Sequence, residues 1–245
     1  MKNTLFSFFV FSLFYLIVLP GYGQGTKQDT VFLSSSIENT RALFEKSIGV
    51  QSNLYNGVHA KRYNYDIAEL LPFYFPDWEN GSVQYDHELY SNVPLLYDLV
   101  LDKVIVSQIL TAAEIELITI KTDWFTLRDH TFIHLRQDPL VKYIDDGFYE
   151  LLYDGNIRLY AKKKKIIKEH IEGLKIEHEI SAVDRYFIYK EGHYTPVKKL
   201  SSVLAVLSDK DKELKSYSKQ SKLNFKKRTE ASLKQIVRFY DLGIK

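Results

Sequence analysis

Hydrophobic and polar residues alternate with a period of two over most of the chain between Gly81 and Val197, as in β-strands whose side chains point to opposite faces of a sheet. Asp154-Gly155-Asn156 and Glu191-Gly192 are hairpin turn signals within this region. No helical pattern separates neighbouring segments, so a parallel sheet is disfavoured. We expect a curved antiparallel meander, either open or partly closed into a barrel. The alternating segments are 83–85, 89, 93–99, 103–108, 115–120, 124–127, 131–135, 147–153, 157–161, 185–190 and 193–197.

After Pro196 the period changes to that of amphipathic helices, and three of them are predicted between residues 199 and 245. Ser208 and the acidic residues after it mark the start of the second helix, and the third ends at Gly243. Each helix has a narrow apolar stripe opposite a lysine-rich face, so we expect the helices to pack on the sheet. The apolar positions are Leu200, Val203, Leu204 and Leu207, then Leu214 and Tyr217, then Leu233, Ile236, Val237 and Tyr240.

The chain before the sheet contains one more helix signal. Ser35-Ser36-Ile37-Glu38 has the form of a capping box and predicts a short helix that ends near Gly49. Asn56-Gly57 predicts a turn that opens the first strands. Two prolines exclude a central strand within residues 71–78, which we interpret as an aromatic loop packed over a sheet edge. The predicted fold class is therefore α+β and β-rich, with a short N-terminal helix and three C-terminal helices.

Residues 1–23 have the organisation of a secretory signal peptide. A positive residue precedes an apolar run from Leu5 to Leu19, and small residues follow at the positions that a signal peptidase reads. This run is shorter than the roughly 20 residues that span a bilayer, so we expect cleavage after Gly23. An uncleaved membrane anchor is the alternative. The predicted mature protein is exported to the periplasm, the outer membrane or the exterior, and consists of a β-rich domain (24–198) and a helical segment (199–245).

Composition narrows the possible functions. The chain has 245 residues and no cysteine, which excludes thiolate metal sites, cysteine nucleophiles and disulfides. Residues 24–161 carry 11 basic and 20 acidic side chains, a net charge of −9, whereas residues 162–245 carry 21 and 11, a net of +10. The basic part either docks on the acidic part, faces solvent, or binds an anionic partner. Nucleic acid is disfavoured, because export separates the protein from it and the basic residues are mostly lysine.

Several stretches of the chain are similar to a family of uncharacterised exported proteins typical of the Bacteroidota. They are 92–98 (NVPLLYD), 147–155 (GFYELLYDG), 184–189 (DRYFIY) and 204–214 (LAVLSDKDKEL). The resemblance implies a location in the envelope or periplasm, allows peripheral membrane contact, and implies no particular reaction. Asp29-Thr30-Val31 also resembles the O-glycosylation acceptor pattern of that phylum, which makes Thr30 a candidate glycosylation site.

The sequence contains no serine elbow, zinc-protease motif or glycine-rich phosphate loop. Its most polar constellation is Arg128-Asp129-His130 with His134. On a strand the two histidines would face one side, about 13 Å apart at ~3.3 Å per residue, which is too far to share one ion. We interpret them as hydrogen-bonded histidines near a strand end, with a metal site or a proton relay as the alternative. No metal and no cofactor is predicted.

Two further groups are candidates for binding. Tyr74 and Trp78 have the ring type that stacks on sugars, although we favour core packing as the explanation of this aromatic stretch. The run of Lys162, Lys163, Lys164 and Lys165 would attract an anionic partner, or else is a strand end that frays into solvent. The following stretch, which contains His170 and Glu177-His178-Glu179, is interpreted as a solvated polar connection.

These patterns together predict a non-catalytic cell-envelope protein with a binding or scaffolding role. Its partner would be an anionic envelope component or another envelope protein. The first alternative is a periplasmic carrier that holds a hydrophobic ligand in a curved-sheet cavity, for which the 18 Tyr and 15 Phe are well suited. The second alternative is an uncharacterised hydrolase. The candidate ligand-binding residues are Trp78, Tyr74, His130, His134 and Arg128.

Overall fold

The computed structural model describes residues 36, 37, 40, 53–61, 63, 71–108, 111–137, 142–173 and 175–243. Contacts divide the chain into two compact units, 1–49 and 50–245. In the first unit Ser36, Ile37 and Thr40 are helical, and the Thr40 hydroxyl donates to the Ser36 carbonyl oxygen at 2.8 Å. The rest of the predicted N-terminal helix, the predicted signal peptide and Thr30 lie outside the described residues.

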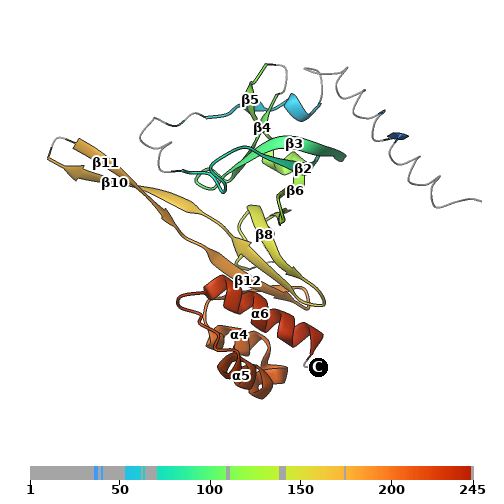
Figure 1. Cartoon of the computed structure of the whole chain (residues 1–245), viewed down its shortest axis with the longest axis vertical. Coiled ribbons are helices and arrows are strands. Elements are labelled where there is room, and N and C mark those ends of the chain that lie inside the picture. Colours follow the sequence, from blue (N-terminus) through green and yellow to red (C-terminus); the bar gives the residue numbers. More distant parts are fainter. Residues whose placement is uncertain are drawn as a thin grey trace, which may run out of the picture. The chain divides into compact units, whose positions relative to one another are not determined.

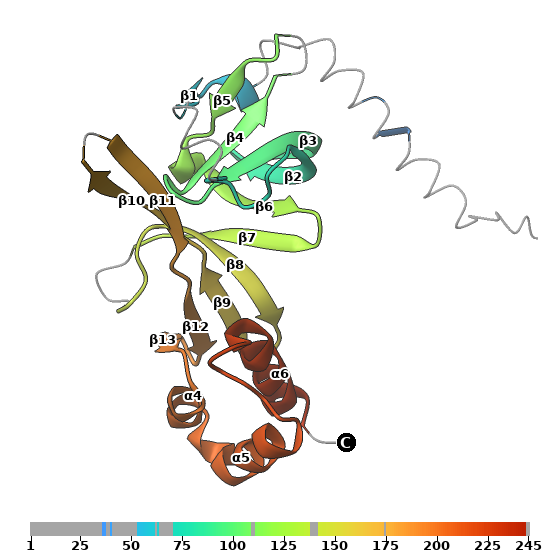
Figure 2. The same cartoon turned by 60° about the vertical axis from the view of Figure 1, so that its left-hand side comes forward.

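Eleven of the thirteen strands in the described residues form one antiparallel sheet in the order β1-β5-β4-β3-β2-β6-β7-β8-β9-β12-β13 (Figures 1 and 2). Among these strands β1 and β13 remain the two edges, so the sheet is open. The prediction of a β-rich antiparallel fold is confirmed. The strands are β1 (Val58–His59), β2 (Glu79–Tyr85), β3 (Glu88–Asp98), β4 (Lys103–Ser107), β5 (Glu114–Glu116), β6 (Thr122–Leu127), β7 (His130–Leu135), β8 (Gly147–Asp154), β9 (Arg158–Lys162), β12 (Arg185–Lys190) and β13 (His193–Val197).

The sheet departs from a simple meander where β1 pairs with β5, where β2 pairs with β6 and where β9 pairs with β12. Strands β2 to β5 follow one another outward, but β6 returns to pair with the free side of β2, with Val83 opposite Phe125. The predicted strand 115–120 is also shorter than expected, because β5 ends at Glu116 and a 3₁₀ turn, η3 (Thr119–Lys121), follows. Leu117 is still buried in the core, but Ile118 and Ile120 after it are exposed.

The stretch after β9 was interpreted as a solvated polar connection, with no secondary structure assigned. Most of its side chains are exposed, but it is regularly paired. It forms a two-stranded antiparallel ribbon, β10 (Lys165–Glu172) and β11 (Lys175–Ala182), that turns at Gly173 with φ of +64°. The Val183 amide donates to the Lys164 carbonyl oxygen at 2.8 Å, so the ribbon continues the β9–β12 hairpin outward. Figures 1 and 2 show it leaving the sheet as an extended projection. We call residues 165–182 the arm.

Three α-helices follow the sheet, as predicted: α4 (Leu200–Val206), α5 (Asp211–Gln220) and α6 (Thr229–Leu242). A 3₁₀ turn, η4 (Ser208–Lys210), separates the first two. The helices pack on the sheet through a shared core in which Leu159 and Ile188 of the strands meet Val203, Leu214 and Ile236 of the helices. None of the described helices has the length and hydropathy needed to cross a lipid bilayer.

Side chains of the strands from β2 to β8 form a second hydrophobic core. Phe125 and Phe132 stack with ring centroids 4.8 Å apart, and Phe148 meets Phe125 edge-on at 5.1 Å. All three side chains are buried, and Tyr97 closes the group. The aromatic loop 71–78 packs against this core: Tyr74 contacts Phe132 at 5.0 Å, and the loop bridges β3 only once, through Phe73 and Asp98. The absence of a regular strand here agrees with the two prolines.

Candidate functional site

A buried carboxylate at the centre of β8 organises the most polar part of the sheet. The Glu150 side chain is 3% exposed, and its Oε1 lies 2.6 Å from Nδ1 of His130 on β7. The Tyr74 hydroxyl lies 3.0 Å from the same nitrogen and donates to Glu150 Oε2 at 3.2 Å. Burial, followed by the charge of Glu150, raises the pKa of Tyr74 well above its usual value. The tyrosine therefore stays protonated and remains a donor.

Lys163 extends this group to the last helix. Its ammonium group is 3.9 Å from Glu150 Oε2 and 3.1 Å from Asp184, and it forms an ion pair with Glu230 at the start of α6. Burial alone would lower the pKa of Lys163, but the hydrogen bond to Glu230 and the charges of Glu230 and Asp184 raise it. Three carboxylates thus lie around the ammonium group of Lys163, and one of them, Glu150, also contacts His130. We call Tyr74, His130, Glu150, Lys163, Asp184 and Glu230 the polar network.

The sequence candidates divide between this network and other places. Tyr74 and His130 belong to the network. The Arg128 guanidinium lies 4.2 Å from the ring centroid of Phe75, and this ring contacts both Tyr74 and His130. Arg128 also pairs with Glu79. Trp78 is 36% exposed and lies on the same loop as Tyr74.

His134 does not join the network. Its side chain is 1% exposed, packs on Phe148 and lies 3.4 Å from Asp146, whereas His130 pairs with Glu150. Within the described residues no group of three or more His, Asp or Glu side chains could hold a metal ion. The interpretation of hydrogen-bonded histidines holds for His130, but it is wrong for His134, because neither of its buried ring nitrogens has a hydrogen-bond partner in the described part of the chain.

The four lysines at the end of β9 do not form one exposed patch. Lys162 is buried, pairs with Asp102 and donates to the Phe148 carbonyl oxygen at 3.1 Å. Lys163 lies in the polar network, and Lys165 donates to the carbonyl oxygens of Leu71 and Phe73. Lys164 is the exposed member of the run. Alternation along the strand sends the side chains to different faces, so three of the four charges are used within the protein.

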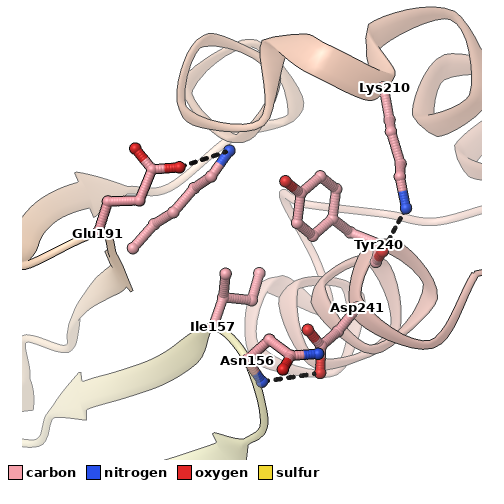
Figure 3. A pocket seen from close by; sticks show the side chains of 7 residues that line it. Asn156, Ile157, Glu191, Lys210, Tyr240 and Asp241 are labelled. Carbon is pink, nitrogen blue, oxygen red and sulfur yellow. Dashed lines mark hydrogen bonds and ion pairs between the residues drawn. The ribbon is translucent and has the colours of Figure 1, made fainter.

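A pocket of about 300 Å³ lies where the β8–β9 and β12–β13 turns meet the end of α6 (Figure 3). Lys190 and Lys210 lie 5.2 and 4.9 Å from the ring centroid of Tyr240. Lys190 pairs with Asp209 at 3.0 Å, and Lys210 donates to the Tyr240 carbonyl oxygen at 3.0 Å. A hydrogen bond to Tyr240 and the pairing with Asp209 raise the pKa of Lys190 to about 12.

Asp241 completes this pocket and is also engaged. It accepts hydrogen bonds from the Tyr153 hydroxyl at 2.8 Å and the Asn156 amide at 3.1 Å. Both lysines and this carboxylate therefore have partners inside the protein. The pocket is best understood as the joint that fixes two hairpin turns to the C-terminal helix.

The arm carries two apolar side chains that are mostly exposed to solvent. Ile171 is 77% exposed and Ile176, directly opposite it, is 60% exposed. One pair further in, His178 Nε2 lies 3.5 Å from Glu169 Oε1 on the same face. Isolated surface isoleucines are ordinary, but two paired across a projecting ribbon form a patch.

Comparison with protein family models, curated proteins and solved structures gives no match. The similarity to exported envelope proteins therefore stays a prediction.

Sequence reasoning missed Glu150, Lys163 and Glu230 as members of one group. Glu150 stands in an alternating strand among apolar residues, and its inward position was a signal that could have been used. The approach of Glu230 depends on how α6 packs on β9, and the pattern of a single segment does not contain that information.

Proposed function

We propose that this chain is a non-catalytic, exported binding or scaffolding protein of the cell envelope, and that the arm is the element it presents to its partner. One observation carries the proposal: the arm projects from the sheet with the Ile171–Ile176 pair facing solvent. A ribbon of two strands is marginally stable in water by itself. Contact with a partner would bury these side chains and stabilise the ribbon.

The filled sheet supports this proposal over the carrier alternative. A carrier needs an apolar cavity, but Phe125, Phe132 and Phe148 pack on one another in the core of the sheet and are at most 1% exposed. A hydrophobic ligand at that position would have to displace these rings. The carrier therefore ranks below the binding role.

A hydrolase remains the third candidate, and the His130–Glu150 pair is the observation that favours it. A buried carboxylate that orients an imidazole is a common arrangement for a general base. Here, however, Tyr74 also occupies Nδ1, and Nε2 lies 3.4 Å from Asp129. Replacing His130 by Gln is expected to lower the stability of the protein without reducing partner binding; loss of a hydrolytic activity instead would favour the enzyme.

Site-specific photocrosslinking in cells that produce the protein tests the proposal. A photoreactive phenylalanine derivative replaces Ile171 on the apolar face, and the matched control carries it at His170, whose side chain is 58% exposed and points to the opposite face. We expect a discrete crosslinked product from position 171 and much less from position 170. Equal products from both positions, or none from position 171, would contradict a binding role of the arm.

Cell fractionation tests the other half of the proposal. The mature protein is expected in the periplasmic or outer-membrane fraction, with an N-terminus at Gln24. Recovery from the cytoplasm with an intact Met1 would contradict export.

A further inference from the structure

We infer that the partner of the arm is the arm of a second copy of this chain. The inference rests on the proposed function and names the partner. It depends on the order of residues along the two faces of the arm, on the exposure of the apolar face, and on the distribution of charge.

The two faces of the arm differ in chemistry. Residues directly opposite each other in an antiparallel pair lie on the same face. One face therefore carries three successive cross-strand pairs: Ile167 with Ile180, Glu169 with His178, and Ile171 with Ile176. The other face carries Ile166 with Ser181, followed by Lys168 with Glu179 and His170 with Glu177. We call the first of these the isoleucine face.

The charge of the arm disfavours an anionic partner. Residues 165–182 contain three Lys, four Glu and two His, so lipid headgroups or an acidic polysaccharide would meet more carboxylates than ammonium groups. On the isoleucine face the polar side chains are Glu169 and His178, which are opposite each other, and Lys165 at the base of the arm, which donates to the Leu71 and Phe73 carbonyl oxygens. A partner for this face must therefore be apolar at both ends and carry a base and an acid in the middle.

A second isoleucine face meets this description in one orientation. When two arms lie parallel, with a two-fold axis along their length, β10 of one arm covers β11 of the other. Ile171 then meets the second copy's Ile176, and Glu169 meets the second copy's His178. In the antiparallel orientation Glu169 would instead face the second copy's Glu169, which is unfavourable because the two carboxylates repel each other. Such an isologous contact closes after two copies, so the product is a dimer.

The oligomeric state of the full chain tests the inference. Wild-type protein is expected to be a concentration-dependent dimer by light scattering after gel filtration. Replacing Ile171 by Asp should weaken the dimer at least about tenfold, because the charge would be buried in an apolar contact. The matched control is Ile166→Asp on the opposite face, where Ile166 is 39% exposed; it should leave the dimer intact. Near-ultraviolet circular dichroism verifies that both variants retain the native core.

The absence of cysteine from the chain allows a test of the orientation. Facing sheets lie about 10 Å apart, a distance that a short bismaleimide bridges. In the parallel arrangement the two copies of Ile171 lie at the same level along the arms, so the reagent should join an Ile171→Cys chain to a second copy of itself. In the antiparallel arrangement centred on Glu169 the two copies of Ile171 lie four residues, about 14 Å, apart along the arms, and each faces the second copy's Ile167. Joining of Ile171→Cys to Ile167→Cys, with little joining of Ile171→Cys to itself, would overturn the parallel arrangement.

The results separate this inference from the function on which it rests. A monomeric wild type, or equal weakening by Ile166→Asp and Ile171→Asp, overturns the dimer. If photocrosslinking at position 171 then yields a product with a different protein, the arm is still the binding element and the inferred partner is wrong. If neither a self-product nor a foreign product forms, both fail.

Discussion

Lys163, the residue after β9, forms an ion pair with Glu230 in the first turn of α6. The contact joins the sheet to the last helix, and the same ammonium group lies 3.9 Å from buried Glu150. A carboxylate in the first turn also interacts favourably with the helix dipole. The sheet and the C-terminal helices are therefore held together by the ion pairs of the polar network as well as by their shared apolar core.

Removing this ammonium group should be costly. In Lys163→Met the buried carboxylate of Glu150 and the partly buried Glu230 lose their common cation, and breaking a buried pair on one side typically costs about 3–5 kcal/mol. We expect a loss of about 3 kcal/mol in the free energy of unfolding, measured by urea denaturation. The neighbouring exposed Lys164→Met is the control and should change it by less than about 0.5 kcal/mol. Equal effects of the two substitutions would contradict the assigned network.

Alkaline pH should destabilise the protein. Burial raises the pKa of Tyr149 and Tyr194 to about 12, and the network raises that of Lys163. The folded chain thus retains protons that the unfolded chain releases above about pH 10. Stability falls with rising pH wherever the folded state binds more protons than the unfolded state, so the free energy of unfolding should be level from neutral pH to about pH 10 and fall as pH rises towards 12.

Urea denaturation at a series of pH values measures this dependence. Tyr194→Phe should make the decline shallower, because it removes one of the retained protons. Tyr143→Phe, at a side chain that is 60% exposed, is the control. A decline that is unchanged in Tyr194→Phe would show that other groups cause it.

Gly147 should tolerate no side chain. Its φ is +138°, and a Cβ would lie 2.1 Å from Asp102 Oδ2 and 2.4 Å from Lys162 Nζ. Gly147→Ala should therefore cost about 3 kcal/mol, since backbone strain adds to disruption of the Asp102–Lys162 pair. Gly192 also has a positive φ, +83°, but open space around it. Gly192→Ala should cost only about 1 kcal/mol, and the difference between the two variants in denaturant unfolding measures the effect of the close approach.

The aromatic loop should matter less for stability than the core it covers. Phe132 is fully buried between Phe125 and Tyr97, and Phe132→Ala should cost about 3–5 kcal/mol through the cavity it creates. Trp78→Ala should cost less than about 1 kcal/mol, because the side chain is 36% exposed. Thermal unfolding of both variants measures the two losses. A large loss from Trp78→Ala would mean that the indole supports the core and is not free to contact a ligand.

Local signals in the sequence were sufficient to predict much of this fold. The Asp154-Gly155-Asn156 turn and the alternating segments on both sides of it predict the β8–β9 hairpin, and the stripe from Leu233 to Tyr240 predicts α6. The return of β6 to β2 was not predictable in this way, because the choice of a neighbouring strand depends on contacts distant in sequence. The polar network was missed for the same reason.

The arm was missed for a different reason. Ile167 and Ile171, and likewise Ile176 and Ile180, are four residues apart, which places each pair on one face of a strand, but Lys, Glu and His fill the positions between them and Gly173 interrupts the run. Without a buried face to produce a clear contrast, such a ribbon resembles a solvated connection in composition. Its regularity becomes visible only when Ile171 is seen opposite Ile176.

The arm grows from β9 and β12, so its base belongs to the sheet while its tip is free to vary. Adding or removing one residue on each side of the turn lengthens or shortens the projection by about 3.4 Å and leaves the register of the sheet unchanged. The length of the arm can therefore change during evolution without changes in the core of the sheet.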